Sequence, residues 1–238
     1  MIDLAKNHQD AHRRLLGWIG LLLPALLVFL LIFRDGWARW DSLNSISAYY
    51  YTGAVAAFVG MLVSMSLFLF TYRGYEGKPY HRADRLVGII AAVAALGVAV
   101  FPTGEPMGVL RLTWWQPWHG WAHYGCAVVL FAMFAVYALV LFRLTPTGPG
   151  GKMSLSIRGR DLVYMICGVL IVVSMLYAGY AGFFADGEIF WPESIALIAF
   201  AVSWLVKGKA LAETAKAAVG RVKSAMKPRA AQTSVQEG

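Results

Sequence analysis

Charged residues are scarce in this sequence. Of its 238 residues, 14% are Asp, Glu, Lys or Arg, whereas 59% are hydrophobic and the mean hydropathy is +0.59. A soluble domain carries roughly 25% charged residues, so the composition excludes a soluble globular protein. The apolar runs take up nearly the whole length, which predicts one compact helical unit without a separate soluble domain.

Cysteine is also rare, and no secretory signal peptide is recognisable. The two cysteines, Cys126 and Cys167, are expected in different apolar runs at different depths, which favours packing residues over a disulfide. The first apolar run is too long for a signal peptide and lacks a small-residue cleavage site. We therefore expect this run to be retained as a membrane span.

Long apolar runs are what the sequence does have. A helix needs about 20 mostly apolar residues to cross a hydrocarbon core of about 30 Å. Six segments meet this requirement: 15–33, 50–72, 86–101, 120–142, 162–183 and 189–206. Pro102 is expected to end the third of them. The predicted fold class is all-α, an integral membrane six-helix bundle spanning residues 15–206.

The basic residues predict the orientation of this bundle. Of the 21 Lys and Arg residues, only three lie in the gaps after the first, third and fifth apolar runs: Arg34, Arg39 and Arg111. Cytoplasmic loops are enriched in Lys and Arg, so both termini are predicted to be cytoplasmic, in a multi-pass protein of the bacterial inner (plasma) membrane. The expected partners are the lipid bilayer and its anionic lipids at the cytoplasmic face, and not nucleic acid.

Three segments outside the spans have predictions of their own. Residues 1–14 are expected to form a cytoplasmic N-terminal arm. Residues 207–227 have the pattern of a basic amphipathic juxtamembrane helix on the inner leaflet, or alternatively of a solvated extension of the last span. Residues 228–238 have the composition of a disordered tail.

Tryptophan is concentrated at the outer ends of the predicted spans, where indole rings favour the headgroup layer. These residues are expected to anchor the bundle, and they can also line a recess. They are Trp37, Trp40, Trp114, Trp115, Trp118, Trp121 and Trp191.

His119 and His123 lie four residues apart at the outer end of the fourth span, on one helix face and about 6 Å apart along the axis. This spacing allows two imidazoles to bind one metal ion, with Glu193 or Asp41 completing the ligand shell. Zinc would lower the pKa of a bound water and create a nucleophile. The alternative is that both histidines only donate or accept hydrogen bonds near the membrane surface.

The other polar residues expected at the outer end also have two interpretations. Glu193 follows Pro192 in the first turn of the last span, where a carboxylate stabilises the helix N-terminus, yet an ionisable group at the hydrocarbon edge usually has a partner. Asp41 is either a pocket residue or a helix cap. Ser45, Ser47 and Tyr50 can orient a polar ligand or simply cap the second span.

The sequence favours neither haem binding nor proton-coupled transport. Haem needs axial ligands from opposite faces, whereas the two membrane-edge histidines share one helix. No Asp, Glu, Lys or Arg is expected at mid-membrane, which weighs against proton-coupled transport.

Six segments within residues 40–208 carry a resemblance to known proteins: 45–52, 68–75, 101–103, 119–123, 193–194 and 203–208. Through them most of this range resembles a family of uncharacterised bacterial six-span inner-membrane proteins, which implies the six-span fold but no particular activity. A weaker similarity is to membrane zinc hydrolases of the adiponectin receptor and alkaline ceramidase type, which have seven spans and a third intramembrane histidine.

The expected function follows from this distribution of polar residues. The sequence predicts a small polar pocket at the periplasmic end of the bundle that binds a metal ion or a polar lipid headgroup, with hydrolysis of that lipid as one consequence. The alternative is a non-enzymatic membrane scaffold, a partner-binding subunit or a small transporter.

Overall fold

The computed structural model describes residues 2–36, 43–74, 80–105, 112–144, 158–185 and 187–208. Over these ranges the chain is helical and contains no strand, which confirms the predicted all-α class. The main helices are α1 (Ile2–Asp35), α2 (Val55–Thr71), α3 (His81–Val100), α4 (Pro117–Val136), α5 (Arg158–Phe184) and α6 (Phe190–Lys207). A short 3-10 helix, η2 (Ser47–Tyr51), precedes α2, and one π-helical turn, η3 (Tyr137–Leu141), continues α4.

Five helices in the described ranges are long and apolar enough to cross a membrane. They are His8–Arg34 within α1, α3, α4 extended to Leu141, Gly159–Phe184 within α5, and α6. The remaining helix, α2, is equally apolar but has 17 residues, which corresponds to about 26 Å at 1.5 Å per residue. The fold is therefore that of a membrane-spanning helical bundle.

Two helices begin at other residues than the predicted segments do. The expected N-terminal arm, 1–14, is not separate from the first span, because α1 begins at Ile2 and continues without a break. No glycine or proline interrupts this stretch, and the i, i+3 ion pair of Asp10 and Arg13 stabilises the helix there. The second helix begins at Val55 instead of residue 50, because residues 47–51 form η2. The predictions for 209–238 lie outside the described residues.

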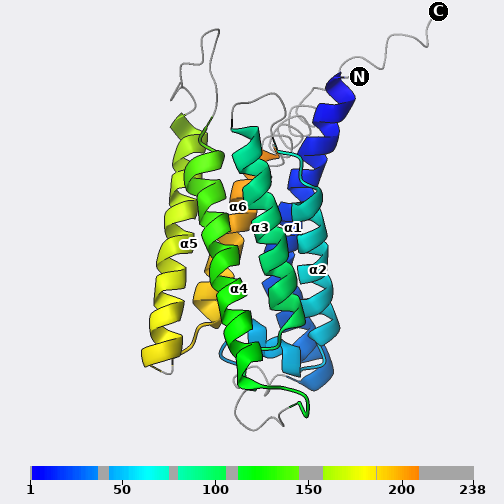
Figure 1. Ribbon diagram of the computed structural model, residues 1–238, viewed down its shortest axis with the longest axis vertical. Helices are drawn as coiled ribbons and strands as arrows, with labels where there is room; N and C mark the ends of the chain where they lie inside the picture. Colours follow the sequence, from blue (N-terminus) through cyan, green and yellow to red (C-terminus); the bar gives the residue numbers. More distant parts are fainter. Residues whose placement is uncertain are drawn as a thin grey trace, which may run out of the picture.

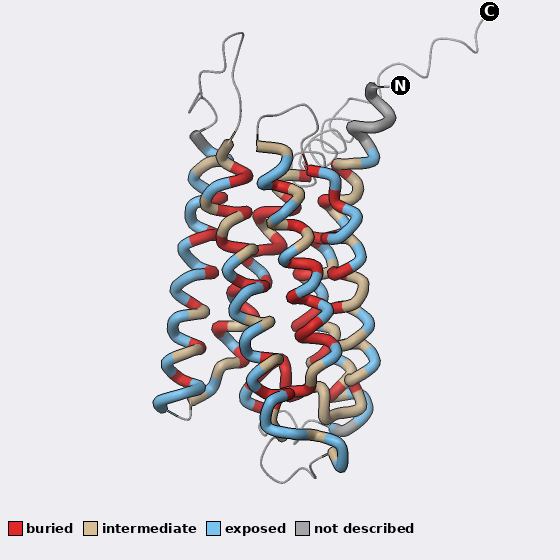
Figure 2. The backbone as a smooth tube through the Cα atoms, in the orientation of Figure 1, coloured by how far each residue is buried: buried red, intermediate tan, exposed pale blue. Residues whose placement is uncertain are grey.

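The six helices are arranged as a closed ring (Figure 1). Each helix packs against its neighbours in the sequence, and α1 packs against α6. Buried residues face the interior of this ring and exposed residues face outward (Figure 2). Among the five long helices α6 is the most enclosed: 61% of its most apolar stretch is buried, against 33% for α5. The ring therefore has a side-chain core, and its outer surface is the one available to lipid.

Contact between α1 and α6 depends on a glycine. A Cβ atom added at Gly17 would lie 2.6 Å from Leu205 Cγ and 3.0 Å from the Ala201 carbonyl oxygen. Small residues allow membrane helices to approach closely and gain van der Waals contact. Gly17 thus permits the contact that closes the ring.

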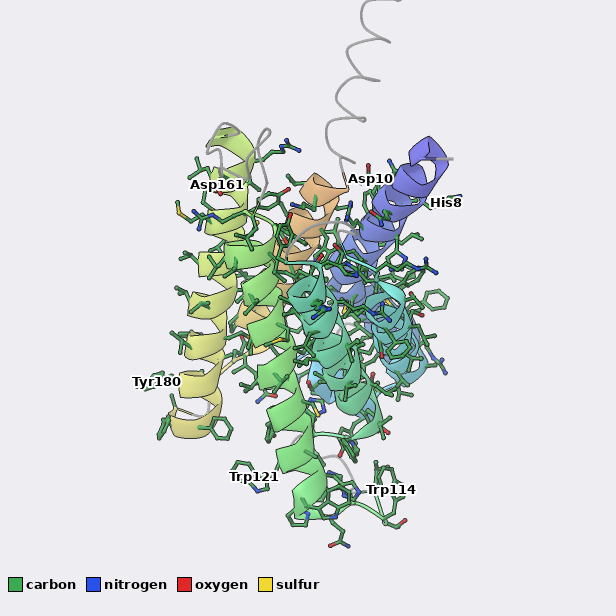
Figure 3. All side chains as sticks on the ribbon, turned by 45° about the horizontal axis from the view of Figure 1, so that its top comes forward. His8, Asp10, Trp114, Trp121, Asp161 and Tyr180 are labelled. Atoms are coloured by element: carbon green, nitrogen blue, oxygen red, sulfur yellow. The ribbon has the colours of Figure 1, made fainter. Side chains whose placement is uncertain are left out.

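The two ends of the bundle differ in composition. At the terminal end, where α1 begins and α6 ends, Figure 3 shows His8, Asp10 and Asp161, and at the opposite tryptophan end it shows Trp114, Trp121 and Tyr180. Among the described side chains, the tryptophan end carries a single Lys or Arg, Arg34. The others lie near the terminal end: Arg13, Arg14, Arg73, Arg82, Arg85, Arg143, Arg160 and Lys207.

Candidate functional site at the tryptophan end

The segment before α2 bonds to the start of α6. The Asn44 carbonyl oxygen accepts hydrogen bonds from the amides of Ile189 (2.8 Å) and Phe190 (2.7 Å). The Ile46 amide donates to Glu193 Oε2 at 2.7 Å. Because the first amides of a helix have no partner within the helix, the Asn44 carbonyl acts as a cap supplied from a distant part of the chain.

His123 is deeply buried at this end, with 1% of its surface exposed. Its Nδ1 lies 2.7 Å from the Phe101 carbonyl oxygen, and its Nε2 lies 2.8 Å from Ser47 Oγ. A carbonyl oxygen can only accept, so Nδ1 carries the proton in the neutral ring and Nε2 is left as an acceptor for the Ser47 hydroxyl. Ser47 itself is nine-tenths buried.

The extended segment after α3 is held in place by three side chains. The Phe101 carbonyl is bonded by His123, the Pro102 carbonyl accepts from Trp115 Nε1 (3.2 Å), and the Thr103 carbonyl accepts from the Tyr51 hydroxyl (2.7 Å). Pro102 has no amide hydrogen and cannot continue α3, which ends at Val100 as the sequence predicts. The acceptor that orients His123 is therefore part of a well-bonded segment.

His119 occupies a different environment from His123. Its Nδ1 accepts a hydrogen bond from the Gln116 amide (2.8 Å), and the Gln116 side chain accepts from the His119 amide, so the two form a capping box at the start of α4. The His119 ring stacks on Trp118 with centroids 3.9 Å apart. His119 therefore closes the helix end and packs against an aromatic residue.

The remaining residues predicted at this site have local roles or are not described. Ser45 Oγ accepts from the Ala48 amide at 3.0 Å and so caps η2. Tyr50 is half-buried, and its ring packs against Tyr51 and Phe58. Asp41 lies outside the described residues. The structure thus brings Ser47, His123 and Glu193 together around residues 46–47.

The potential metal-binding side chains do not form a metal site in the described part of the chain. No group of three or more His, Cys, Asp or Glu side chains there is placed to hold a metal ion. Both ring nitrogens of His123 and the Nδ1 of His119 have hydrogen-bond partners. The zinc site of His119, His123 and Glu193 stays a prediction from spacing, and the described contacts do not favour it.

Two further hydroxyl groups at this end, those of Tyr49 and Ser194, are buried. Tyr49 is fully buried against Phe190, and Ser194 follows Glu193 on α6. Neither hydroxyl has a hydrogen-bond partner among the described residues. Burial raises the pKa of Tyr49, so its hydroxyl keeps the proton at neutral pH.

A second polar cluster, at the terminal end, was missed by the sequence interpretation. This terminal-end cluster consists of Asp10, Arg13, Tyr72, Asp84, Tyr137 and Lys207. Arg13 Nη1 lies 2.9 Å from Asp10 Oδ1, and the Arg13 guanidinium sits 5.7 Å from the centroid of the Tyr72 ring. Asp10, Arg13 and Asp84 are all more than nine-tenths buried.

Asp84 and Lys207 connect this cluster to four helices. Asp84 Oδ2 accepts from the Tyr72 hydroxyl at 3.4 Å, and its backbone carbonyl accepts from the Tyr137 hydroxyl at 3.0 Å. Lys207 Nζ donates to the Phe142 carbonyl at 2.8 Å, at the end of η3. The available sequence signals were the i, i+3 spacing of Asp10 and Arg13 and the position of Asp84 just before an apolar run.

Fold and site together define an all-α membrane-spanning bundle with a bonded polar cluster at each end. Comparison of the chain with protein-family models, curated proteins and solved structures finds no match.

Proposed function

We propose that the protein crosses a bacterial inner membrane six times, with α2 as the sixth span and both termini in the cytoplasm. The charge difference between the two ends supports this orientation, because Lys and Arg are retained on the cytoplasmic side. The exposed Trp118, Trp121 and Trp191 at the other end support a position in the outer headgroup layer. The short α2 can be accommodated by local thinning of the bilayer.

The orientation is testable with reporters. A reporter enzyme that works only in the cytoplasm should be active when it is fused after Gly238. A reporter enzyme that works only in the periplasm should be active when it is inserted at residues 106–111, between α3 and α4. The reverse pattern would contradict the proposal.

We propose further that the tryptophan-end cluster, which consists of Ser47, His123 and Glu193, binds the polar headgroup of an outer-leaflet lipid that carries an amine. The observation that carries this is that Glu193 and His123 bond to consecutive residues, Ile46 and Ser47, and that Glu193 lies in the first turn of α6 with the exposed Trp191. Of the described charged side chains at this end, Glu105, Glu188 and Glu193 are carboxylates and Arg34 is the cation. This charge favours an ammonium group, as in phosphatidylethanolamine, over an anionic headgroup.

The test compares retained lipids. Purified protein equilibrated with equal amounts of phosphatidylethanolamine and phosphatidylglycerol should retain the first over the second by up to about fivefold, since a partly exposed ion pair contributes about 0.2–1 kcal/mol. Glu193→Gln should lose this preference while its amide oxygen still accepts from the Ile46 amide. Glu188→Gln, an equal change of charge at an exposed position, is the matched control. The same preference in Glu193→Gln and wild type would reject the proposal.

A non-enzymatic scaffold or partner-binding subunit is the second candidate. It is favoured by the extent of internal bonding, because His123 and Glu193 connect the segment before α2 to α3, α4 and α6. A protein with only this role should retain both lipids equally.

A further inference from the structure

We propose that Ser47 and His123 form a nucleophile and general base, without a metal ion, that cleaves a carboxylic ester in a lipid at the tryptophan end. This inference rests on the proposed function, because the lipid whose headgroup binds there is the substrate. It differs from the zinc chemistry predicted from the sequence, since the attacking atom is a serine oxygen and not a metal-bound water.

The geometry meets the first requirement of such a pair. Ser47 Oγ lies 2.8 Å from His123 Nε2, within the range that a general base needs to accept a hydroxyl proton. The base also needs an orienting group on its other nitrogen, and the Phe101 carbonyl supplies one at 2.7 Å. The neutral ring therefore presents its lone pair to the Ser47 hydroxyl.

The three partners come from elements that other contacts hold in place. Ser47 begins η2, whose Ala48 amide bonds Ser45, and the Phe101 carbonyl belongs to the segment fixed by Trp115 and Tyr51. His123 lies on the second turn of α4, facing the interior. A nucleophile and base held in one geometry lower the entropic part of a reaction barrier.

Depth favours a carboxylic ester over a phosphate ester. His123 lies five residues beyond the exposed Trp118, which is about 7.5 Å deeper along the helix. In a glycerolipid the acyl ester bonds lie just below the phosphate. A lipid phosphate at the level of Trp118 therefore brings an ester carbonyl toward the level of the Ser47–His123 pair.

The reaction balances with water as the only other reactant. Ser47 Oγ attacks the ester carbonyl carbon as its proton passes to His123 Nε2. The bond from the carbonyl carbon to the alcohol oxygen breaks, His123 protonates the departing alcohol, and the acyl group stays on Ser47. A water then gives its proton to His123 and attacks the acyl carbon, and the proton returns to Ser47 Oγ as the carboxylic acid leaves.

An alkyl fluorophosphonate tests this pair without a known substrate. The reagent forms a bond between an activated serine oxygen and phosphorus and releases fluoride. In full-length protein in lipid vesicles we expect labelling of Ser47, located by mass spectrometry of the labelled peptide. His123→Gln can keep a hydrogen bond to Ser47 but supplies no base, so its labelling rate should fall by about 10²- to 10⁴-fold, the usual contribution of a general base.

Ser194→Ala is the matched control, because Ser194 is also a buried serine at the tryptophan end and has no hydrogen-bond partner among the described residues. It should be labelled at the wild-type rate, whereas Ser47→Ala should not be labelled. Folded wild type that stays unlabelled, or carries its label elsewhere, would overturn the proposal. Failure of the lipid preference with Ser47 still labelled contradicts the headgroup proposal, whereas an intact preference without a label contradicts the nucleophile.

Discussion

Replacing Arg13 by methionine is expected to lower the free energy of unfolding by about 3–5 kcal/mol, the cost of breaking a buried ion pair by removing one partner. The Arg13 and Asp10 side chains are only 4% and 11% exposed, and Nη1 lies 2.9 Å from Oδ1. Without the guanidinium, the buried Asp10 carboxylate loses a charged hydrogen-bond donor. Denaturant unfolding of purified protein in detergent micelles measures the change.

Two comparisons separate the loss of the ion pair from the loss of any arginine. Arg160→Met removes an exposed arginine at the same end of the bundle and should change the free energy by less than about 0.5 kcal/mol. The double variant Asp10→Asn with Arg13→Met should recover part of the lost stability, because neither charge then remains. Equal stability of Arg13→Met and Arg160→Met would show that the pair does not stabilise the fold.

Replacing Trp204 by alanine should lower the free energy of unfolding by a similar amount, about 3–5 kcal/mol. Trp204 is fully buried, and its ring lies 5.1 Å from each of the rings of Tyr72, Tyr137 and Phe142. Within a membrane the lipid tails are as apolar as the core, so the loss comes from missing van der Waals contacts and the cavity left behind.

Two other variants, studied by the same unfolding measurement, are controls for Trp204→Ala. Trp204→Phe keeps an aromatic ring and removes an indole N–H that has no partner among the described residues, so it should cost clearly less than alanine. Trp121→Ala changes a tryptophan that is 68% exposed at the opposite end and should cost little in micelles. A Trp204→Ala variant as stable as Trp121→Ala would contradict this account of the core.

The helices could be predicted closely from local sequence because the requirement is local. A run of about 20 apolar residues in a membrane satisfies its backbone groups only as a helix, whatever the rest of the chain does. Pro102 marks the end of α3 for the equally local reason that it lacks an amide hydrogen. The helix bounds differ from the predicted segments where polar residues remain helical, as in residues 2–14, or where a 3-10 turn replaces α-helix, as in η2.

The candidate site could be predicted only in its composition. His123, Glu193 and Ser47 were expected at one end of the bundle, but the spacing of His119 and His123 suggested two equivalent ligands. In the structure His119 bonds to Gln116 within its own helix, whereas His123 bonds to Ser47, 76 residues away. Spacing on one helix specifies which side chains share a face, and it says nothing about the partners that the facing helices bring.

By itself, then, the sequence determined the all-helical membrane class, the approximate helices and the separation of basic residues from tryptophans, since each depends on runs or counts of residue types. Tertiary structure alone decided that Asn44 caps α6, that Glu193 bonds Ile46 at a separation of 147 residues, and that Arg13 and Asp84 are buried. The physical reason is that a buried polar group must find a hydrogen-bond partner, and in a closed ring of helices that partner is chosen by which helices become neighbours.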